Sequence, residues 1–234
     1  MPKMPAVLVA VLAGATAVTA SPLAANDPLH PAVVELYQSQ GCSSCPPAIG
    51  NINAIAGRPD VLALTFAVTY WDQLGWKDTF ARSEFTKRQY DYARAGGRGN
   101  VATPQTIVNG RKVTNGGDMA ELIAAMRAGD RGQSGPAITK SGEKVRIGGG
   151  AAVRPATIWL VRYDPRALKV PIRAGENGGR TIIHRNVVRS LSAIGKWAGN
   201  EVIVTAPTAA DPNLRSAILV QSGSGGPIVA AARL

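Results

Sequence analysis

The chain of 234 residues has two cysteines, Cys42 and Cys45, in the stretch GCSSCPPA. At this spacing a disulfide can open and close between neighbouring turns of backbone without opening the fold. A purely structural disulfide is the simplest alternative, but closing a four-residue loop restricts the unfolded chain by only about 2 kcal/mol in the chain-entropy model. A zinc site needs about four ligands, and only His30 and His184 accompany the cysteines, without ligand-like spacing. The pair therefore favours dithiol chemistry.

The residues around the pair indicate which thiol attacks. If Cys42 lies at a helix N-terminus, unpaired backbone N–H groups lower the pKa of its thiol and make it the attacking sulfur. Cys45 is then the less exposed thiol that resolves a mixed disulfide. Pro46 and Pro47 fit only the first turn of a helix, so regular helix is expected to begin around Cys45. A helix that begins there leaves Cys42 with fewer aligned backbone N–H donors to stabilise its thiolate.

The first half of the chain predicts a β-α-β-α-β-β-α order that positions the cysteine turn. Asp78 and Asp118 are expected helix N-caps, Gly129 is the expected stop of the last helix, and Asn109-Gly110 is typical of a type I′ hairpin turn. The expected elements are a strand at 33–37, a helix at 47–57, a strand at 61–70, a helix at 78–96, a hairpin at 104–115 and a helix at 116–129.

Three distant motifs are expected to meet at one edge of this sheet. Strands on either side of the first helix should be parallel, so the cysteine turn and the YWDQLGW loop leave the sheet at the same edge. The segment before Pro104 reaches that edge too if the third strand is antiparallel. Trp71 and Trp76 then form an apolar platform for a client, or they anchor their own loop to the core, while Asp72 caps the loop or tunes the thiols.

The second half differs in composition. Residues 26–130 carry ten Lys/Arg and ten Asp/Glu, whereas residues 131–234 carry fifteen and five. The switch falls in the Gly- and Pro-containing stretch at 129–137, where a domain boundary is expected after residue 130. Short apolar runs between Gly, Pro and Asn predict a small, mostly antiparallel β domain at 131–234, a sandwich or barrel. The basic excess suits an anionic envelope surface or acidic clients, and no motif indicates nucleic-acid binding.

The first 25 residues are typical of a secretory signal peptide. One lysine precedes an uncharged apolar run of about fifteen residues, which is short for a bilayer span of about 20, and small residues suited to cleavage follow. A periplasmic or secreted protein without a transmembrane span after cleavage is expected.

Four motifs, GCSSCPPA, TYWDQLGWKD, TPQTIVNGR and HRNVVRSLSAIGKW, resemble the pattern of domain-of-unknown-function family 1223, a family of exported bacterial thioredoxin-like proteins. The resemblance covers nearly all of the chain after residue 25. It implies an α/β thioredoxin-like domain at 26–130, with Cys42 as nucleophile and Cys45 as resolving thiol. It also implies that Thr103 and Pro104 form the loop in which such proteins hold a cis-proline opposite the dithiol and offer backbone groups to an extended client.

Glu35 stands in the strand before the dithiol, about where many thioredoxins carry a buried acid. In that position it would relay the proton that Cys45 must lose. The alternative is a solvated or salt-bridged strand glutamate. His184 is expected to be an ordinary strand residue.

These features lead to three hypotheses. The first is an exported thiol–disulfide oxidoreductase that exchanges disulfides with protein clients and uses no dissociable cofactor. The second is a non-catalytic binding module of the cell envelope whose disulfide is inert. The third is a copper(I)-handling protein that binds the metal through both thiolates and His184.

Overall fold

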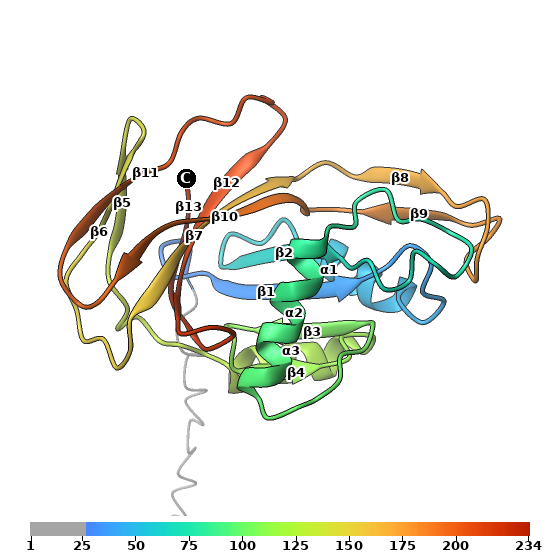
Figure 1. Ribbon diagram of the computed structural model, residues 1–234, viewed down its shortest axis with the longest axis horizontal. Coiled ribbons are helices and arrows are strands. Elements are labelled where there is room, and N and C mark those ends of the chain that lie inside the picture. The colour runs from blue at the N-terminus through green and yellow to red at the C-terminus, as the bar shows by residue number, and fades with distance from the viewer. Residues whose placement is uncertain (1–26) are drawn as a thin grey trace, which may run out of the picture.

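The computed structural model describes residues 27–234 as a mixed α/β fold built on one large, mostly antiparallel sheet (Figure 1). The expected signal peptide lies outside the described residues. No helix among residues 27–234 is long and apolar enough to cross a membrane. The eight strands of the main sheet are, in spatial order, β13 (Ile228–Arg233), β12 (Arg215–Ser222), β7 (Ala156–Asp164), β10 (Val187–Trp197), β2 (Val61–Ala67), β1 (Ala32–Gln38), β3 (Gln105–Val108) and β4 (Lys112–Thr114).

The centre of the sheet follows the predicted order of the first half. β1 and β2 pair in parallel from Ala32↔Val61 to Gln38↔Ala67, and β3 runs antiparallel to β1. Every residue of β1 and β2 is buried, as expected for strands that are covered on both faces. The sheet is therefore covered on both sides at the place where β1 leads into the cysteine turn.

Helices cover the two faces of this central region. α1 (Pro46–Ile55) and α3 (Met119–Ala128) pack on one face, and α2 (Ser83–Ala95) packs on the other. The alternation of side chains along β1 divides the core accordingly: Val34 and Leu36 belong to the cluster around α1, whereas Val33 and Tyr37 belong to the cluster around α2. This division decides which strand residues can reach the cysteines.

Two of the predicted helix boundaries are confirmed and one is wrong. The side chain of Asp118 accepts the N–H of Glu121 at 2.9 Å, and α3 ends immediately before Gly129. Asp78, in contrast, is not the N-cap of α2, which begins five residues later at Ser83. Asp78 instead accepts the N–H groups of Gln40 and Phe80, so it orders the loop that precedes the helix.

The predicted hairpin at Asn109-Gly110 is confirmed, and its asparagine does more than form the turn. Asn109 and Gly110 have φ angles of 49° and 63°, which a type I′ turn requires. The Asn109 side chain is buried, where Oδ1 accepts the N–H of Val33 at 2.8 Å and Nδ2 donates to the carbonyl of Gly129 at 3.0 Å. One side chain thus joins the start of β1 to the end of α3.

The second half is mostly antiparallel, as predicted, but it does not form a separate sandwich or barrel. β7, β10, β12 and β13 extend the main sheet, because Val187 of β10 pairs in parallel with Thr65 of β2. Backbone groups on the side of β2 that faces β10 find hydrogen-bond partners there. The Thr65 N–H donates to the carbonyl of Asn186 at 2.9 Å, and the Asn186 side chain donates to the carbonyl of Ala63 at 2.8 Å. The main sheet therefore runs through both halves of the chain.

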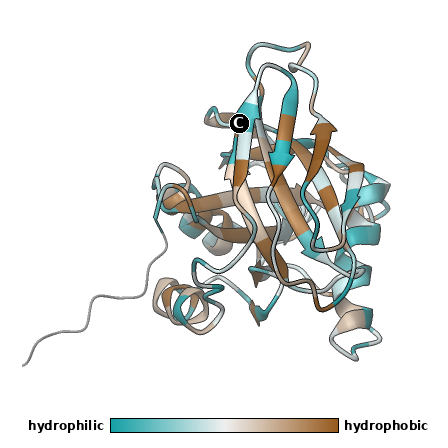
Figure 2. Ribbon diagram, turned by 90° about the vertical axis from the view of Figure 1, so that its left-hand side faces the viewer, coloured by the Kyte–Doolittle hydropathy of each residue, from teal (hydrophilic) through white to brown (hydrophobic). Residues whose placement is uncertain are grey.

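Two smaller sheets complete the second half. β11 (Val202–Thr205), β6 (Lys144–Ile147) and β5 (Ile138–Ser141) pack against one face of the extended sheet around a third apolar cluster. Apolar residues are concentrated along the strands, several of which also carry polar stretches (Figure 2). β8 (Leu168–Pro171) and β9 (Thr181–His184) form a hairpin arm that contacts α1 (Figure 1). This arm carries a segment of the second half towards the cysteine turn.

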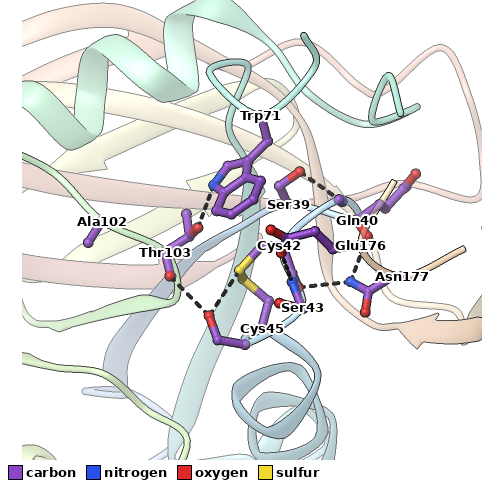
Figure 3. Close-up of a disulfide and its surroundings, with 12 residues drawn as sticks. Ser39, Gln40, Cys42, Ser43, Cys45, Trp71, Ala102, Thr103, Glu176 and Asn177 are labelled. Atoms are coloured by element: carbon purple, nitrogen blue, oxygen red, sulfur yellow. Dashed lines mark hydrogen bonds between the residues drawn. A yellow bond between two sulfur atoms is a disulfide. The ribbon is translucent and has the colours of Figure 1, made fainter. Parts of the chain in front are cut away.

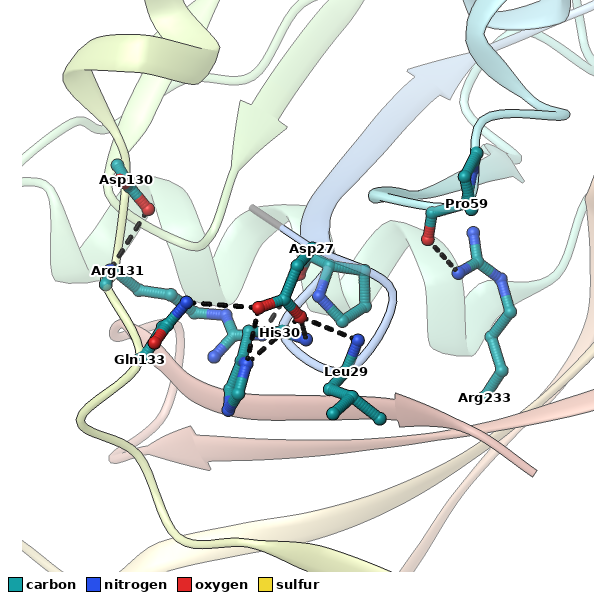
Figure 4. A network of polar contacts seen from close by, with 10 residues as sticks. Asp27, Leu29, His30, Pro59, Asp130, Arg131, Gln133 and Arg233 are labelled. Carbon is teal, nitrogen blue, oxygen red and sulfur yellow. Dashed lines mark hydrogen bonds and ion pairs between the residues drawn. The ribbon is translucent and has the colours of Figure 1, made fainter. Parts of the chain in front are cut away.

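The first described residues are tied to the connection after α3 (Figure 4). Asp27 contacts His30 at 3.1 Å and accepts the Gln133 side chain at 3.0 Å, while Arg131 donates to the carbonyl of Pro31 at 3.1 Å. These contacts fix the start of β1, whose far end leads into the cysteines.

Candidate functional site: a covered disulfide

Cys42 and Cys45 form a disulfide between the end of β1 and the start of α1, with their Cα atoms 5.4 Å apart (Figure 3). The Cys45 N–H donates to the Cys42 carbonyl at 3.1 Å and closes the turn. Cys45 is the N-cap of α1, and Pro46 and Pro47 occupy its first turn, so the predicted start of the helix is confirmed. Cys42 therefore lies before the helix, and the first turn of the helix lacks two N–H donors.

Both cysteines are fully buried, each with 0 % of its surface exposed. The expectation that Cys42 is the more accessible thiol is therefore wrong for the oxidised, closed structure. Trp71 and Trp76 pack against the apolar cluster that contains both cysteines. A thiol from another molecule reaches either sulfur only if part of this cover moves.

The three expected motifs do meet at the disulfide. The Thr103-Pro104 peptide is cis, and the Thr103 carbonyl accepts the hydroxyl of Ser44 at 3.4 Å. The indole of Trp71 donates to Thr103 Oγ1 at 2.7 Å. Ser44 Oγ also lies 3.3 Å from Cys42 Sγ, so one hydroxyl contacts both the sulfur and the loop before Pro104.

The two tryptophans anchor their own loop, which is the alternative that the sequence left open. Trp71 is fixed by its hydrogen bond to Thr103, and Trp76 donates to the Gln40 side chain at 2.9 Å. Asp72 orders the same loop because its carboxylate accepts the N–H of Asp78 at 3.0 Å. Burial raises the pKa of Asp78 to about 6, although hydrogen bonds from the backbone of Gln40 and Phe80 oppose this shift.

Glu35 does not lie near the cysteines, so its expected role as a proton relay is corrected. It is buried on the α2 face of the sheet, opposite the face that carries the disulfide. Arg88 donates to Glu35 at 2.8 Å, and the Tyr92 hydroxyl donates to its other carboxylate oxygen. Because successive strand residues point to opposite faces, the Glu35 side chain cannot reach Cys45 through β1.

Two residues of the second half, Glu176 and Asn177, contact the cysteine turn (Figure 3). The buried Asn177 side chain donates to the carbonyls of Gln40 at 2.9 Å and Cys42 at 2.8 Å. A Glu176 carboxylate oxygen accepts the Ser43 N–H at 3.0 Å. Sequence analysis did not identify these two residues, because they lie about 130 residues from their partners and no local pattern connects them.

His184 is a buried strand residue rather than part of the cysteine site. It is 0 % exposed, and neither ring nitrogen has a hydrogen-bond partner among the described residues. Its ring packs edge-on against Phe80, with centroids 5.7 Å apart. Burial lowers the pKa of His184 to about 4. No group of three or more His, Cys, Asp or Glu residues within 27–234 is arranged to hold a metal ion.

A cavity of about 430 Å³ lies away from the disulfide, beside α2 and the second-half strands. Arg88, Trp159 and Gln221 are among its lining residues, and the Arg88 guanidinium lies over the Trp159 ring. Arg88 is already compensated by Glu35 and hydrogen-bonded to Gln221 at 2.8 Å. Arg88 therefore belongs to a structural network of ion pair and hydrogen bonds.

Comparisons with known proteins agree with this architecture. The crystal structure of protein AGR_C_4864 from Agrobacterium tumefaciens is similar over 87% of this chain and 93% of that chain, with 33% sequence identity and a TM-score of 0.71. HBP35 of Porphyromonas gingivalis is similar in fold alone, with 11% identity and a TM-score of 0.60 over 88% of this chain and 74% of that chain. No curated protein matches the sequence. The sequence profile described as "Protein of unknown function (DUF1223)" matches residues 33–221, and the chain belongs to that family.

Proposed function

We propose that this protein is an exported thiol–disulfide oxidoreductase with a thioredoxin-like core that acts through the Cys42–Cys45 pair. The observation that carries the proposal is the position of the disulfide: it lies between a central strand and a helix, beside the Thr103 carbonyl. A structural cross-link of so short a loop contributes little stability, whereas this position gives a dithiol a backbone acceptor for an extended client. The secretory pattern of residues 1–25 supports action outside the cytoplasm.

The proposed exchange needs only a client dithiol or disulfide. In the oxidising direction, a client thiolate attacks Cys42 Sγ, the Cys42–Cys45 bond breaks, and Cys45 leaves as a thiolate that takes up a proton. A second client thiolate then attacks the client sulfur of the mixed disulfide and releases Cys42. The client loses two electrons and two protons, and the Cys42–Cys45 pair gains them. Reduction of a client follows the same steps in reverse.

The residues around the pair assist these steps in different ways. Ser44 Oγ, 3.3 Å from Cys42 Sγ, can rotate from the Thr103 carbonyl and donate to the Cys42 thiolate when it forms. The Thr103 carbonyl is then free to accept an N–H from an extended client. Because Glu35 lies on the other face, the proton of Cys45 passes to solvent or to the client rather than to that carboxylate.

A trapping experiment tests the proposal. The Cys45→Ala variant is reduced, incubated with a peptide disulfide, and analysed by intact mass without reductant. We expect a stable mixed disulfide on Cys42 of the Cys45→Ala variant. The Cys42→Ser variant lacks the attacking thiol and should not exchange disulfides with the peptide in the same assay. The matched control is the double variant Cys42→Ser/Cys45→Ser. If no peptide disulfide across a range of redox buffers forms an adduct with Cys45→Ala, the proposed function is wrong.

A further inference from the structure

The β8–β9 loop, residues 173–180, covers the cysteine turn and is held there by hydrogen bonds and by packing against Trp76. Asn177 is buried and its side-chain amide donates to two carbonyls of the turn, those of Gln40 and Cys42. The Arg180 side chain donates to Asn177 Oδ1 at 3.1 Å and holds the amide in this orientation. Gly175, with φ +74°, lies against Trp76, where an added Cβ would come within 3.2 Å of the Trp76 side chain. The loop is thus fitted to the turn and to the tryptophan loop.

Glu176 is the one acidic group of this loop, and it lies over the amide beside Cys42 (Figure 3). Its carboxylate accepts the Ser43 N–H at 3.0 Å. Hydrogen bonds from the Ser43 side chain and backbone lower the pKa of Glu176, so the carboxylate is ionised at neutral pH. A negative charge therefore lies at the cysteine turn while the loop is closed.

The charge at the cysteine turn depends on redox state. In the disulfide form, the sulfur of Cys42 is uncharged and the carboxylate of Glu176 accepts the Ser43 N–H without a neighbouring negative charge. After reduction, a Cys42 thiolate would be stabilised by donors of the same turn and opposed by the nearby carboxylate. A closed loop and a Cys42 thiolate therefore disfavour each other.

We propose that Glu176 is a positioning residue that holds the 173–180 loop closed over the oxidised pair and opposes the Cys42 thiolate, so that loop opening and disulfide reduction are coupled. This inference rests on the proposed function of the pair. Because coupling is reciprocal, reduction loosens the loop to the same extent that loop closure favours the disulfide. The loop also determines which clients react, since a client must displace a carboxylate and bring its own thiol to the same turn.

The charge is tested with Glu176→Gln, which keeps an oxygen acceptor for the Ser43 N–H and removes the negative charge. Glu201→Gln is the matched control, because Glu201 is paired with Arg146 on the small sheet. Each purified protein is equilibrated with mixtures of reduced and oxidised dithiothreitol, free thiols are alkylated, and the reduced fraction is read by intact mass. Each reduction converts one protein disulfide and one dithiothreitol dithiol into a protein dithiol and the cyclic disulfide.

We expect Glu176→Gln to raise the equilibrium constant for reduction about fivefold, equivalent to about 20 mV for a two-electron couple, because Glu176 is exposed and solvent screens its charge; Glu201→Gln should leave the constant unchanged. An equilibrium constant for Glu176→Gln within twofold of the wild type overturns the proposal, and so does an equal shift in Glu201→Gln. Glu176→Asp, which retains the charge, should stay closer to the wild type than Glu176→Gln does.

A second measurement needs no variant. Amide hydrogen exchange of the wild-type protein should be faster in residues 173–180 after reduction, whereas exchange in α3 should not change. Equal protection of the loop in both redox forms contradicts the coupling. These readouts use small thiols alone, so they are distinct from the trapping experiment: a protein that shows the coupling but never forms a client adduct retains this inference and loses the proposed function.

Discussion

Buried His184 should make the wild-type protein less stable in acid, and the His184→Leu variant should not show this effect. Both ring nitrogens lack partners among the described residues, and burial lowers the pKa of His184 from 6.5 to about 4. The folded protein therefore binds a proton at this site less readily than the unfolded chain does. His184 therefore does not lower the free energy of unfolding above pH 6.5. The wild-type protein loses free energy of unfolding as the pH falls from 6.5 towards 4.

The magnitude follows from the pKa difference. At about 1.36 kcal/mol per pKa unit, the loss is about 2 kcal/mol at pH 5 and approaches about 3 kcal/mol below pH 4. Leucine is apolar, does not titrate and is close to histidine in size, so its variant should not show this loss. Asp78 has the opposite dependence, because its raised pKa favours the folded state as the pH falls, and the same term is present in both proteins.

Urea unfolding of the oxidised protein at pH 8, 6.5 and 5 measures the effect. The free energy of unfolding of His184→Leu minus that of the wild type should rise by about 2 kcal/mol between pH 8 and pH 5. Ile183→Leu, a substitution in the same strand that introduces and removes no titratable group, should keep the wild-type dependence. A difference between His184→Leu and the wild type that does not change with pH would refute the reasoning.

Three further substitutions test the fold around the site. Glu35→Gln leaves buried Arg88 uncompensated and should lower the free energy of unfolding by about 3–5 kcal/mol in urea, while the reduction potential of the cysteine pair stays unchanged; a changed potential would restore the relay hypothesis. Asp118→Ala removes the N-cap of α3 and should cost about 1 kcal/mol, so a variant as stable as the wild type would contradict that role. Gly110→Ala places a Cβ on a residue with positive φ and against the carbonyl of Gly226. A thermal or urea scan should show a loss of about 1–3 kcal/mol in the free energy of unfolding. Gly57→Ala is the control, because a Cβ at Gly57 has no neighbour within 4 Å.

Local patterns predicted the parts of the site that depend on short-range chemistry. The two prolines placed the start of α1 at Cys45, Asp118 and Gly129 placed α3, and Asn109-Gly110 placed the hairpin turn. The parallel pairing of β1 and β2 followed from the helix between them, and it brought the cysteine turn, the tryptophan loop and Thr103 together.

The remaining features depend on contacts that short-range patterns do not encode. Glu35 was misplaced because a strand buried on both faces shows no alternation from which to decide the direction of each side chain. The junction between β2 and β10 joins Thr65 to residues more than 120 positions away, so composition suggested a separate domain. The contacts of Glu176 and Asn177 with the cysteine turn likewise join residues more than 130 positions apart.

The accessibility of the disulfide in the folded protein tests the central claim most directly. The oxidised wild-type protein is treated with a small thiol in buffer without denaturant, alkylated, and analysed by intact mass while circular dichroism follows the fold. We predict that both Cys42 and Cys45 become alkylated and that the native spectrum persists, because opening of the 173–180 loop exposes the pair without unfolding. Alkylation that appears only at denaturant concentrations that unfold the protein would contradict the account.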